Sequence, residues 1–352
     1  MLEVSLRHRF SGFDLDARFT APSGLTALFG PSGAGKTTIV NAVSGLLRPD
    51  YGRIVVGDRV LLDTDANVFV PTRKRRIGYV FQEGRLFPHL IVRQNLTYGA
   101  RFLRNADRPP VGPVVDMLGI GALLDRRPAT LSGGERSRVG IGRALLSGPD
   151  LLIMDEPLAA LDDARRQEIM PYLERLRDAA KVPILYISHS VSEVARLATT
   201  LVAVDRGRVV AAGPLAEVAA DPDLGLAQAG DAGAVLGARV VGIEADGLTR
   251  LETVAGPLFI TGEAGQVGRT LQLRIRAADV TISLSRPTDS SALNILPAVV
   301  DRIVPTANAA TIRLTLGDDA AILARITRRS VDALALRPGV PCHATIKSVA
   351  LG

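Results

Sequence analysis

The chain has few of the residues that build covalent or metal-thiolate cross-links. Among its 352 residues there is one cysteine, Cys342, and there is no tryptophan. A single cysteine excludes an internal disulfide framework and any metal site built from several thiolates. No apolar run approaches the roughly 18 residues that a membrane-spanning helix needs, so we expect no transmembrane helix. If the protein meets a membrane, we expect it to do so by binding something embedded there.

Lysine is also scarce, and the excess of positive charge is small. The sequence has 42 basic and 36 acidic residues, a formal net charge of +6. The basic residues are spread along the chain, and their densest cluster, residues 73–76, is typical of a solvated turn. We therefore expect no nucleic-acid partner.

Composition and patterning predict a folded chain of two or three domains. Apolar residues make up 47% of the sequence, which is enough for a substantial core. Residues 1–7 alternate polar and apolar side chains, which predicts a first strand rather than a signal peptide. We expect the protein to stay in the cytoplasm.

The order of the patterns predicts an α/β domain followed by an all-β domain. In residues 1–217, short apolar runs alternate with helical patterns, which favours a mostly parallel sheet. Residues 86–148 are mainly helical in pattern and indicate a helical insertion. Residues 218–234 are rich in alanine, glycine and aspartate and indicate a linker. Residues 235–352 alternate as strands do and predict a small barrel-like β domain.

One glycine-rich segment predicts a nucleotide-phosphate site. It fits the pattern G-x-x-x-x-G-K-[ST] and lies between an apolar strand and a helix, as that motif requires. Backbone N–H groups and the helix N-terminus would surround the phosphates, Lys36 would reach the β- and γ-phosphates, and the Thr37 hydroxyl would ligate Mg²⁺. The predicted nucleotide-binding residues are Gly30, Pro31, Ser32, Gly33, Ala34, Gly35, Lys36, Thr37 and Thr38.

Two carboxylates follow a later apolar strand, residues 151–154. At the carboxyl edge of a parallel sheet such groups face the phosphate site. Asp155 suits a direct or second-sphere role at Mg²⁺, and Glu156 suits orienting or deprotonating a water that attacks the γ-phosphate.

These two motifs do not separate a kinase, a GTPase, a helicase and a transporter motor. The segment Leu131–Glu135 does, because it resembles the LSGGQ signature of ATP-binding-cassette ATPases, with Glu135 where glutamine is usual. Three further residues match that family in the right order: Gln82 at the Q-loop, Asp162 in the D-loop and His189 at the switch position. The chain is therefore identified as a member of the cassette ATPases.

This resemblance implies a head-to-tail homodimer of cassettes. Each ATP would lie between the phosphate loop of one copy and residues 132–135 of the other. The hydroxyl of Ser132 and the amides of Gly133 and Gly134 would meet the γ-phosphate, and the carboxylate of Glu135 would be tolerated beside them.

The resemblance also implies roles for two residues around the γ-phosphate. His189 would contact this phosphate and help to position the water. Gln82 would couple Mg²⁺ and the water to the helical insertion.

An aromatic residue that stacks on adenine is also implied, about 25 residues before Lys36. Phe10 and Phe13 are the candidates, and a plain core role in the first hairpin is open for both. Of the two, Phe10 is the predicted stacking residue.

Three classes of cassette protein are open: the motor of a membrane importer, a soluble cassette acting on ribosomes or DNA, and an oxyanion-binding or storage protein. Soluble translation-type cassettes carry two phosphate loops, and DNA-repair ATPases insert a long coiled coil before the signature; this chain shows neither feature. A storage role leaves the hydrolytic residues unexplained. The importer interpretation implies separate permease subunits, and residues 85–90 resemble the surface offered to their coupling helices.

The C-terminal part indicates the substrate. The segment beginning Ser291-Ala292-Leu293-Asn294 resembles the opening of the Mop-type molybdate-binding domain, and residues 346–349 resemble its closing strand. The resemblance implies a Mop-type unit over residues 290–352 within a regulatory β domain, residues 235–352. Over its whole length the chain resembles molybdate-importer ATPases. An oxyanion site needs hydroxyls, amides and a cation, and the candidates are Ser291, Asn294, Lys347 and Ser348.

One departure concerns this site. Leu293 stands where the motif commonly has arginine, which removes one ligand. A role of Ser291 and Asn294 in capping a strand turn stays open beside molybdate binding.

Together these features predict the ATP-hydrolysing motor of a bacterial molybdate importer, peripheral on the cytoplasmic face of the plasma membrane. Tungstate is an alternative substrate, and a sulfate or other oxyanion importer is an alternative system. The partners implied are a second cassette, the permease and, indirectly, an extracytoplasmic molybdate-binding protein.

Overall fold

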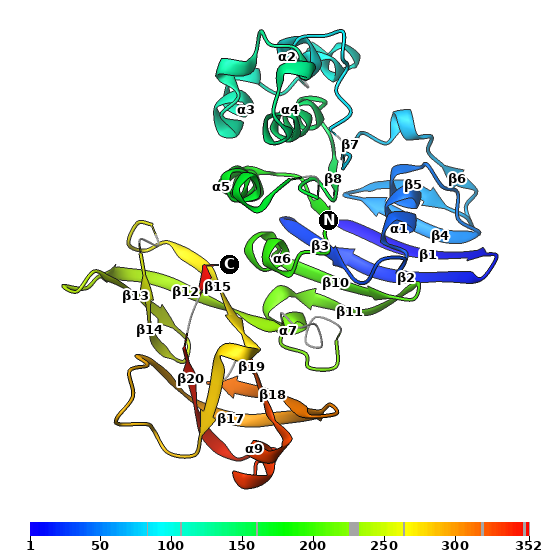
Figure 1. Ribbon diagram of the computed structural model, residues 1–352. Helices are drawn as coiled ribbons and strands as arrows, with labels where there is room; N and C mark the ends of the chain where they lie inside the picture. The colour runs from blue at the N-terminus through cyan, green and yellow to red at the C-terminus, as the bar shows by residue number, and fades with distance from the viewer. Residues whose placement is uncertain are drawn as a thin grey trace. The chain divides into compact units, whose positions relative to one another are not determined.

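The computed structural model describes residues 1–82, 84–105, 108–159, 161–224, 232–262, 265–317, 320–347 and 350–351. The chain divides into two compact units (Figure 1). The first holds Met1–His189 and Leu197–Ala212, and the second holds Ser190–Arg196 and Gly213–Gly352.

The first unit is built on an 11-stranded mixed sheet. Strands β3, β7, β8, β9 and β10 pair in parallel, and β1, β2, β4, β5 and β6 pair in antiparallel fashion. On its other side, β2 pairs in parallel with β11. In hydrogen-bonded order the strands are β6 (Val68–Phe69), β5 (Arg59–Asp63), β4 (Tyr51–Val56), β1 (Leu2–Phe10), β2 (Phe13–Ala21), β11 (Arg208–Pro214), β10 (Thr200–Asp205), β3 (Leu25–Phe29), β9 (Ile184–Ile187), β8 (Leu151–Asp155) and β7 (Ile77–Val80).

The parallel strands of the first unit are apolar and buried. The side chains of Leu151–Met154 in β8 are fully buried, and β9 is buried throughout. Strands that are buried on both faces have continuous apolar sequences. The prediction of an α/β domain from such apolar runs is therefore confirmed.

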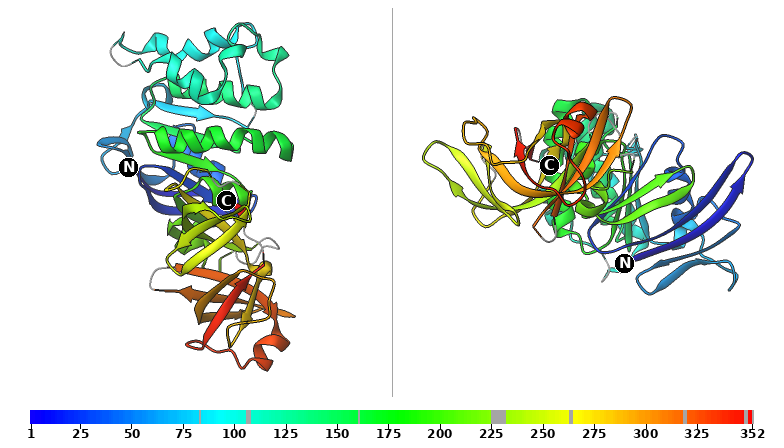
Figure 2. Two further views of the ribbon diagram at one scale, coloured as in Figure 1. Left: turned by 90° about the vertical axis from the view of Figure 1, so that its left-hand side faces the viewer. Right: turned by 90° about the horizontal axis from the view of Figure 1, so that it is seen from below.

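The helices of the first unit fall into two groups. Helix α1 follows the phosphate loop, and α5 follows β8. Helices α2, α3 and α4 lie together at one end of the unit, where Figures 1 and 2 show them in cyan to green beyond β7 and β8. The helices are α1 (Lys36–Ser44), α2 (Val92–Thr97), α3 (Val111–Leu118), α4 (Gly133–Leu146) and α5 (Asp163–Ala179), with short 3₁₀ turns η1 (Thr72–Lys74), η2 (Gly99–Phe102), η4 (Gly121–Leu123) and η5 (Pro128–Thr130).

The second unit contains two five-stranded antiparallel sheets. One has the order β14 (Gly256–Thr261), β13 (Leu248–Thr253), β12 (Gly233–Ile243), β15 (Thr270–Arg276) and β21 (Ala350–Leu351). The other has the order β16 (Val280–Ser283), β20 (Pro341–Ile346), β17 (Asn294–Pro305), β18 (Ala309–Leu316) and β19 (Ala320–Thr327). Inward-facing apolar residues of both sheets form one core, which confirms the all-β prediction.

Short helical elements accompany these sheets: α7 (Leu215–Ala219), η6 (Ala277–Asp279) and α9 (Arg328–Ala333). Helix α6 (Val191–Leu197) crosses the boundary between the units. Between α7 and β12 lies most of the segment predicted as a linker, of which residues 225–231 fall outside the described part. The boundaries at residues 217 and 234 stay a prediction.

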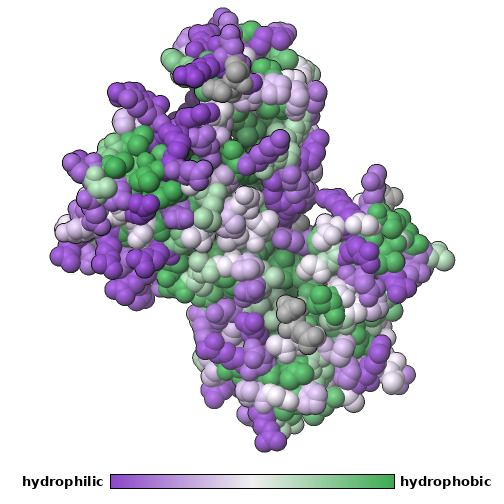
Figure 3. All heavy atoms as spheres, turned by 180° about the vertical axis from the view of Figure 1, so that it is seen from behind, coloured by the Kyte–Doolittle hydropathy of each residue, from purple (hydrophilic) through white to green (hydrophobic). Residues whose placement is uncertain are grey.

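Among the described residues, no helix is long and apolar enough to cross a membrane. Figure 3 shows one face of the molecule, on which hydrophilic and hydrophobic residues alternate in small groups without a continuous hydrophobic band.

Candidate functional site

The phosphate loop connects β3 to α1 and depends on glycine at two places. Gly35 precedes α1 with a φ of 104°, a left-handed backbone conformation that residues other than glycine rarely adopt. A Cβ on Gly30 would collide with the carbonyl oxygen of Val204 in the neighbouring strand β10. The loop can therefore curl tightly beneath the helix N-terminus, the arrangement that binds phosphate.

Lys36 is the buried cation of this loop. Its side chain is 7% exposed, and Nζ donates hydrogen bonds to the carbonyl oxygens of Gly30 (2.7 Å) and Pro31 (2.9 Å). Burial lowers the pKa of Lys36, while the charges of Glu156 and Asp155 act in the opposite direction. The loop carbonyls thus hold the ammonium beside the acidic pair.

Asp155 ends β8 close to this lysine. Burial raises the pKa of its carboxyl group, and a hydrogen bond from Tyr79 Oη to Asp155 Oδ2 (2.9 Å) opposes that rise. Carboxylate and hydroxyl oxygens are the ligands that Mg²⁺ prefers. Asp155, together with the exposed hydroxyl of Thr37, therefore offers donors that fit this ion.

Glu156 and His189 meet at the ends of two adjacent parallel strands, β8 and β9. Glu156 has a φ of 46°, unusual for a residue other than glycine, and its N–H donates to the oxygen of Ile187 (3.0 Å). This backbone turn brings Glu156 Oε1 to 3.5 Å from His189 Nδ1. The histidine side chain is 64% exposed and the glutamate 28% exposed, so solvent reaches both at this edge of the sheet.

A cavity of about 420 Å³ opens over the phosphate loop. Phe10 lies in its wall and is 38% exposed, whereas Phe13 packs against Gly35 and Gly207. Both rings line the cavity, and Phe10 as the residue that stacks on adenine stays a prediction. The lining residues are Phe10, Phe13, Ser32, Gly33, Gly35, Lys36, Thr37, Thr38 and Glu156.

The signature segment begins α4 with a reciprocal capping box. Ser132 Oγ accepts the N–H of Glu135 (3.2 Å), and Glu135 Oε2 accepts the N–H of Ser132 (2.7 Å). Glu135 also pairs with Arg126 (3.3 Å), and the bond from Ser132 is the main cause that lowers its pKa. The departure from glutamine therefore keeps the cap, since a carboxylate accepts the same bond. Ser132 itself is exposed at the helix N-terminus.

The D-loop aspartate plays a capping role as well. Asp162 Oδ1 accepts the N–H of Arg165 (2.9 Å) and caps α5. Ala160 of the same motif lies outside the described residues.

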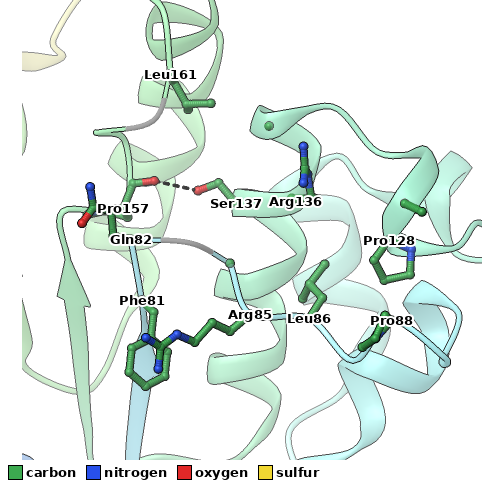
Figure 4. Close-up of a pocket in the computed structure, with 13 residues that line it drawn as sticks. Phe81, Gln82, Arg85, Leu86, Pro88, Pro128, Arg136, Ser137, Pro157 and Leu161 are labelled. Atoms are coloured by element: carbon green, nitrogen blue, oxygen red, sulfur yellow. Dashed lines mark hydrogen bonds between the residues drawn. The ribbon is translucent and has the colours of Figure 1, made fainter.

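Gln82 lies in the wall of a second cavity, of about 550 Å³, rather than among the residues around the phosphate loop. Figure 4 shows Gln82 near Pro157, whose carbonyl oxygen accepts a hydrogen bond from Ser137 Oγ of α4 (3.2 Å). This cavity joins the segment after β7 to the start of α4 and the loop after β8. Its remaining walls come from Phe81, Gly84, Arg85, Leu86, Pro88, Pro128, Ala129, Gly133, Arg136 and Leu161.

A buried asparagine, Asn95, binds the backbone of the segment predicted to face a permease, residues 85–90. Asn95 is fully buried; its Oδ1 accepts the N–H of Phe87 (2.8 Å), and its Nδ2 donates to the oxygens of Phe87 (3.1 Å) and Leu90 (3.0 Å). Arg143 of α4 donates to the oxygen of Arg85 (2.8 Å). These bonds give an exposed loop a fixed shape.

Two of the oxyanion candidates, Asn294 and Lys347, lie at one end of the sheet that contains β17 and β20. Asn294 pairs with Ile346, the residue before Lys347, and Ser291 and Lys347 are exposed. The Asn294 amide is engaged, because it accepts from the N–H of Phe259 (2.7 Å) and donates to the oxygen of the same residue (2.9 Å). Ser348 lies outside the described residues. The described part of the chain holds no group of three or more histidine, cysteine or acidic side chains that could bind a metal.

The contact between Tyr79 and Asp155 was not predicted from the sequence. Its only signal was a hydroxyl in an otherwise apolar strand. The residue that this hydroxyl contacts cannot be identified without the register between β7 and β8.

The chain is similar to known proteins over both units. Residues 16–159 match a family model described as ABC transporter, and residues 290–351 match one described as TOBE domain. Two relatives carry the name molybdenum import ATP-binding protein ModC. One, from Mesorhizobium japonicum, is 51% identical over 99% of this chain and 95% of its own length; the other, from Rhizobium meliloti, is 49% identical over 99% of each chain. A solved ATP-binding subunit of an ABC transporter superposes with a TM-score of 0.51 at 28% identity, covering 62% of this chain and 91% of its own.

Proposed function

The chain belongs to the molybdenum import ATP-binding proteins of the ABC transporter family, and from that premise we propose that it is the ATP-hydrolysing motor of a molybdate importer. The observation that carries the proposal is the convergence of Lys36, Asp155, Glu156 and His189 beside one phosphate loop. A binding or storage protein needs none of this hydrolytic machinery.

In the proposed reaction, residues of the phosphate loop bind the triphosphate of ATP. Lys36 exchanges its loop carbonyls for phosphate oxygens and offsets their charge. Asp155 and Thr37 would hold Mg²⁺, which neutralises charge that develops on the phosphates.

Glu156 would orient the attacking water and accept its proton as the water oxygen bonds to the γ-phosphorus. The bond between that phosphorus and the oxygen bridging to the β-phosphate would break, which releases ADP and phosphate. His189, 3.5 Å from Glu156, would contact the γ-phosphate from the same side. Gln82, in the wall of the second cavity, would couple the Mg²⁺ and the attacking water to the helical insertion.

We propose that two copies pair head to tail around two ATP molecules. The exposed Ser132 hydroxyl and the first amides of α4 would then meet the γ-phosphate bound by the other copy. Because Ser132 Oγ accepts its capping bond from Glu135 N, its own proton stays available for that phosphate.

The proposed partners in the membrane are permease subunits. The cavity of about 550 Å³ beside residues 85–90 would receive the end of a coupling helix, and the fixed shape of these residues suits docking. The protein would then lie peripherally on the cytoplasmic face of a bacterial plasma membrane.

For the second unit we propose a regulatory role in which it senses molybdate. Ser291, Lys347 and Ser348 remain the proposed ligands. Asn294 would not bind the anion directly, because its side-chain amide is hydrogen-bonded to the backbone of Phe259; it would fix the start of β17. Equilibrium binding of molybdate to the full chain tests this, with Lys347→Ala as the matched variant. Absence of binding up to millimolar molybdate would leave the unit a purely structural role.

The motor proposal is tested by uptake of radioactive molybdate into cells that lack their own copy of this chain. We expect the wild-type chain to restore uptake and Lys36→Ala to leave it at background. Equal uptake with both chains would refute the proposal.

A further inference from the structure

A tyrosine hydroxyl contacts the carboxylate that ends β8. Strands β7 and β8 are parallel with Val80 opposite Met154, so the carboxyl ends of both strands reach the same sheet edge. From β7, Tyr79 Oη reaches across and donates to Asp155 Oδ2 at 2.9 Å.

The tyrosine ring is held in place by its own neighbours. It stacks on Phe81 with ring centroids 4.2 Å apart and an interplanar angle of 28°. The Arg85 guanidinium carbon in turn lies 4.3 Å from the centroid of the Phe81 ring, as Figure 4 shows for these two side chains. A stacked ring with few free rotations can hold its hydroxyl at one position.

This contact restricts a half-buried carboxylate that would otherwise rotate. One carboxylate oxygen is bonded to Tyr79, so the other has a defined direction. Groups that orient a metal ligand in this way commonly change metal affinity by 10–100-fold when they are removed.

We propose that Tyr79 is a positioning residue that fixes the Asp155 carboxylate for the divalent cation of the nucleotide site. This inference rests on the proposed function. It assigns to Tyr79 a role in metal affinity that is separate from nucleotide binding by the phosphate loop.

The test uses the full-length chain carrying Tyr79→Phe. Binding of Mn²⁺ to the complex with a non-hydrolysable ATP analogue is followed by the electron paramagnetic resonance signal of free Mn²⁺. We expect Mn²⁺ affinity to fall about tenfold. Affinity for the analogue in EDTA is expected to stay within about twofold, because no phosphate-loop residue has changed.

Tyr172→Phe is the matched control, since it removes the hydroxyl of a half-buried tyrosine whose ring packs on Arg138 and Arg175 of α4 and α5. It should leave Mn²⁺ affinity unchanged. Phe81→Leu keeps the Tyr79 hydroxyl but loosens its ring, and we expect a smaller loss in the same direction.

Unchanged Mn²⁺ affinity in Tyr79→Phe would overturn the inference, and so would an equal loss of analogue affinity in EDTA. Failure of the proposed function looks different: the wild-type chain would then not restore molybdate uptake, whatever the Mn²⁺ affinity of the Tyr79→Phe chain.

Discussion

Replacement of Arg75 by methionine should destabilise the nucleotide-binding unit strongly. Arg75 is 1% exposed, and its guanidinium donates to the carbonyl oxygens of Val70, Ala42 and Val43, each at 2.7 Å. The last two lie at the end of α1, the helix that carries the phosphate loop at its other end. Burial lowers the pKa of Arg75 to about 10, so the group is charged at neutral pH and depends on these acceptors.

The expected loss follows from the carbonyl oxygens that methionine leaves behind. The oxygen of Ala42 keeps a second partner, the N–H of Gly45 at 3.2 Å, so we count two newly unpaired acceptors. At about 1–3 kcal/mol each, the loss is about 4 kcal/mol. For a unit of some 200 residues this lowers Tm by about 8–16 °C.

The assay is thermal unfolding of the full chain, in which the transition that shifts with added ATP identifies the first unit. Arg75→Lys is the control, because an ammonium can reach some of the same oxygens, and its Tm should lie between those of wild type and Arg75→Met. A fall of less than about 3 °C for Arg75→Met would refute the reasoning, since the carbonyls would then have found other partners.

Three further predictions concern the nucleotide site. Glu156→Gln should lower the rate of phosphate release at least about 100-fold while ATP still drives dimerisation in size-exclusion chromatography; turnover near the wild-type rate would remove Glu156 from its role. Phe10→Ala should weaken ATP about tenfold in equilibrium binding without affecting tripolyphosphate, because only base stacking is lost; equal affinity for ATP would exclude Phe10 as the stacking residue. Glu135→Gln should keep ATPase activity within about threefold. Because the folded pKa of Glu135 lies below its ordinary value of 4.5, its stabilising effect is present above that value and is lost as the pH falls through the lowered pKa. The wild-type Tm should therefore fall more steeply below about pH 4.5 than that of Glu135→Gln, and parallel curves would contradict this.

The sequence was sufficient where function depends on residues close together along the chain. The phosphate loop, the capping serine of α4 and the acidic pair after β8 each depend on a local pattern that few folds can satisfy otherwise. The approach of Glu156 to His189 also follows from pattern, since parallel strands bring their carboxyl ends to one edge.

Contacts that depend on strand register or on burial could not be predicted in this way. The bond from Tyr79 to Asp155 requires the register between β7 and β8. The prediction of a solvated turn at residues 73–76 was wrong for Arg75, which is buried because carbonyl oxygens from separate segments bind its guanidinium. Asn294 shows the same limit, because its motif indicated an oxyanion ligand while the fold engages its amide with Phe259, 35 residues away.

The central claim is that this chain couples ATP hydrolysis to the import of molybdate. It is tested most directly by ATPase activity of the chain with its permease in membranes, with an extracytoplasmic binding protein loaded with molybdate, tungstate or sulfate in turn. We predict stimulation by the molybdate-loaded protein and none by the sulfate-loaded protein, with Glu156→Gln inactive throughout. Stimulation by sulfate without stimulation by molybdate would contradict the account.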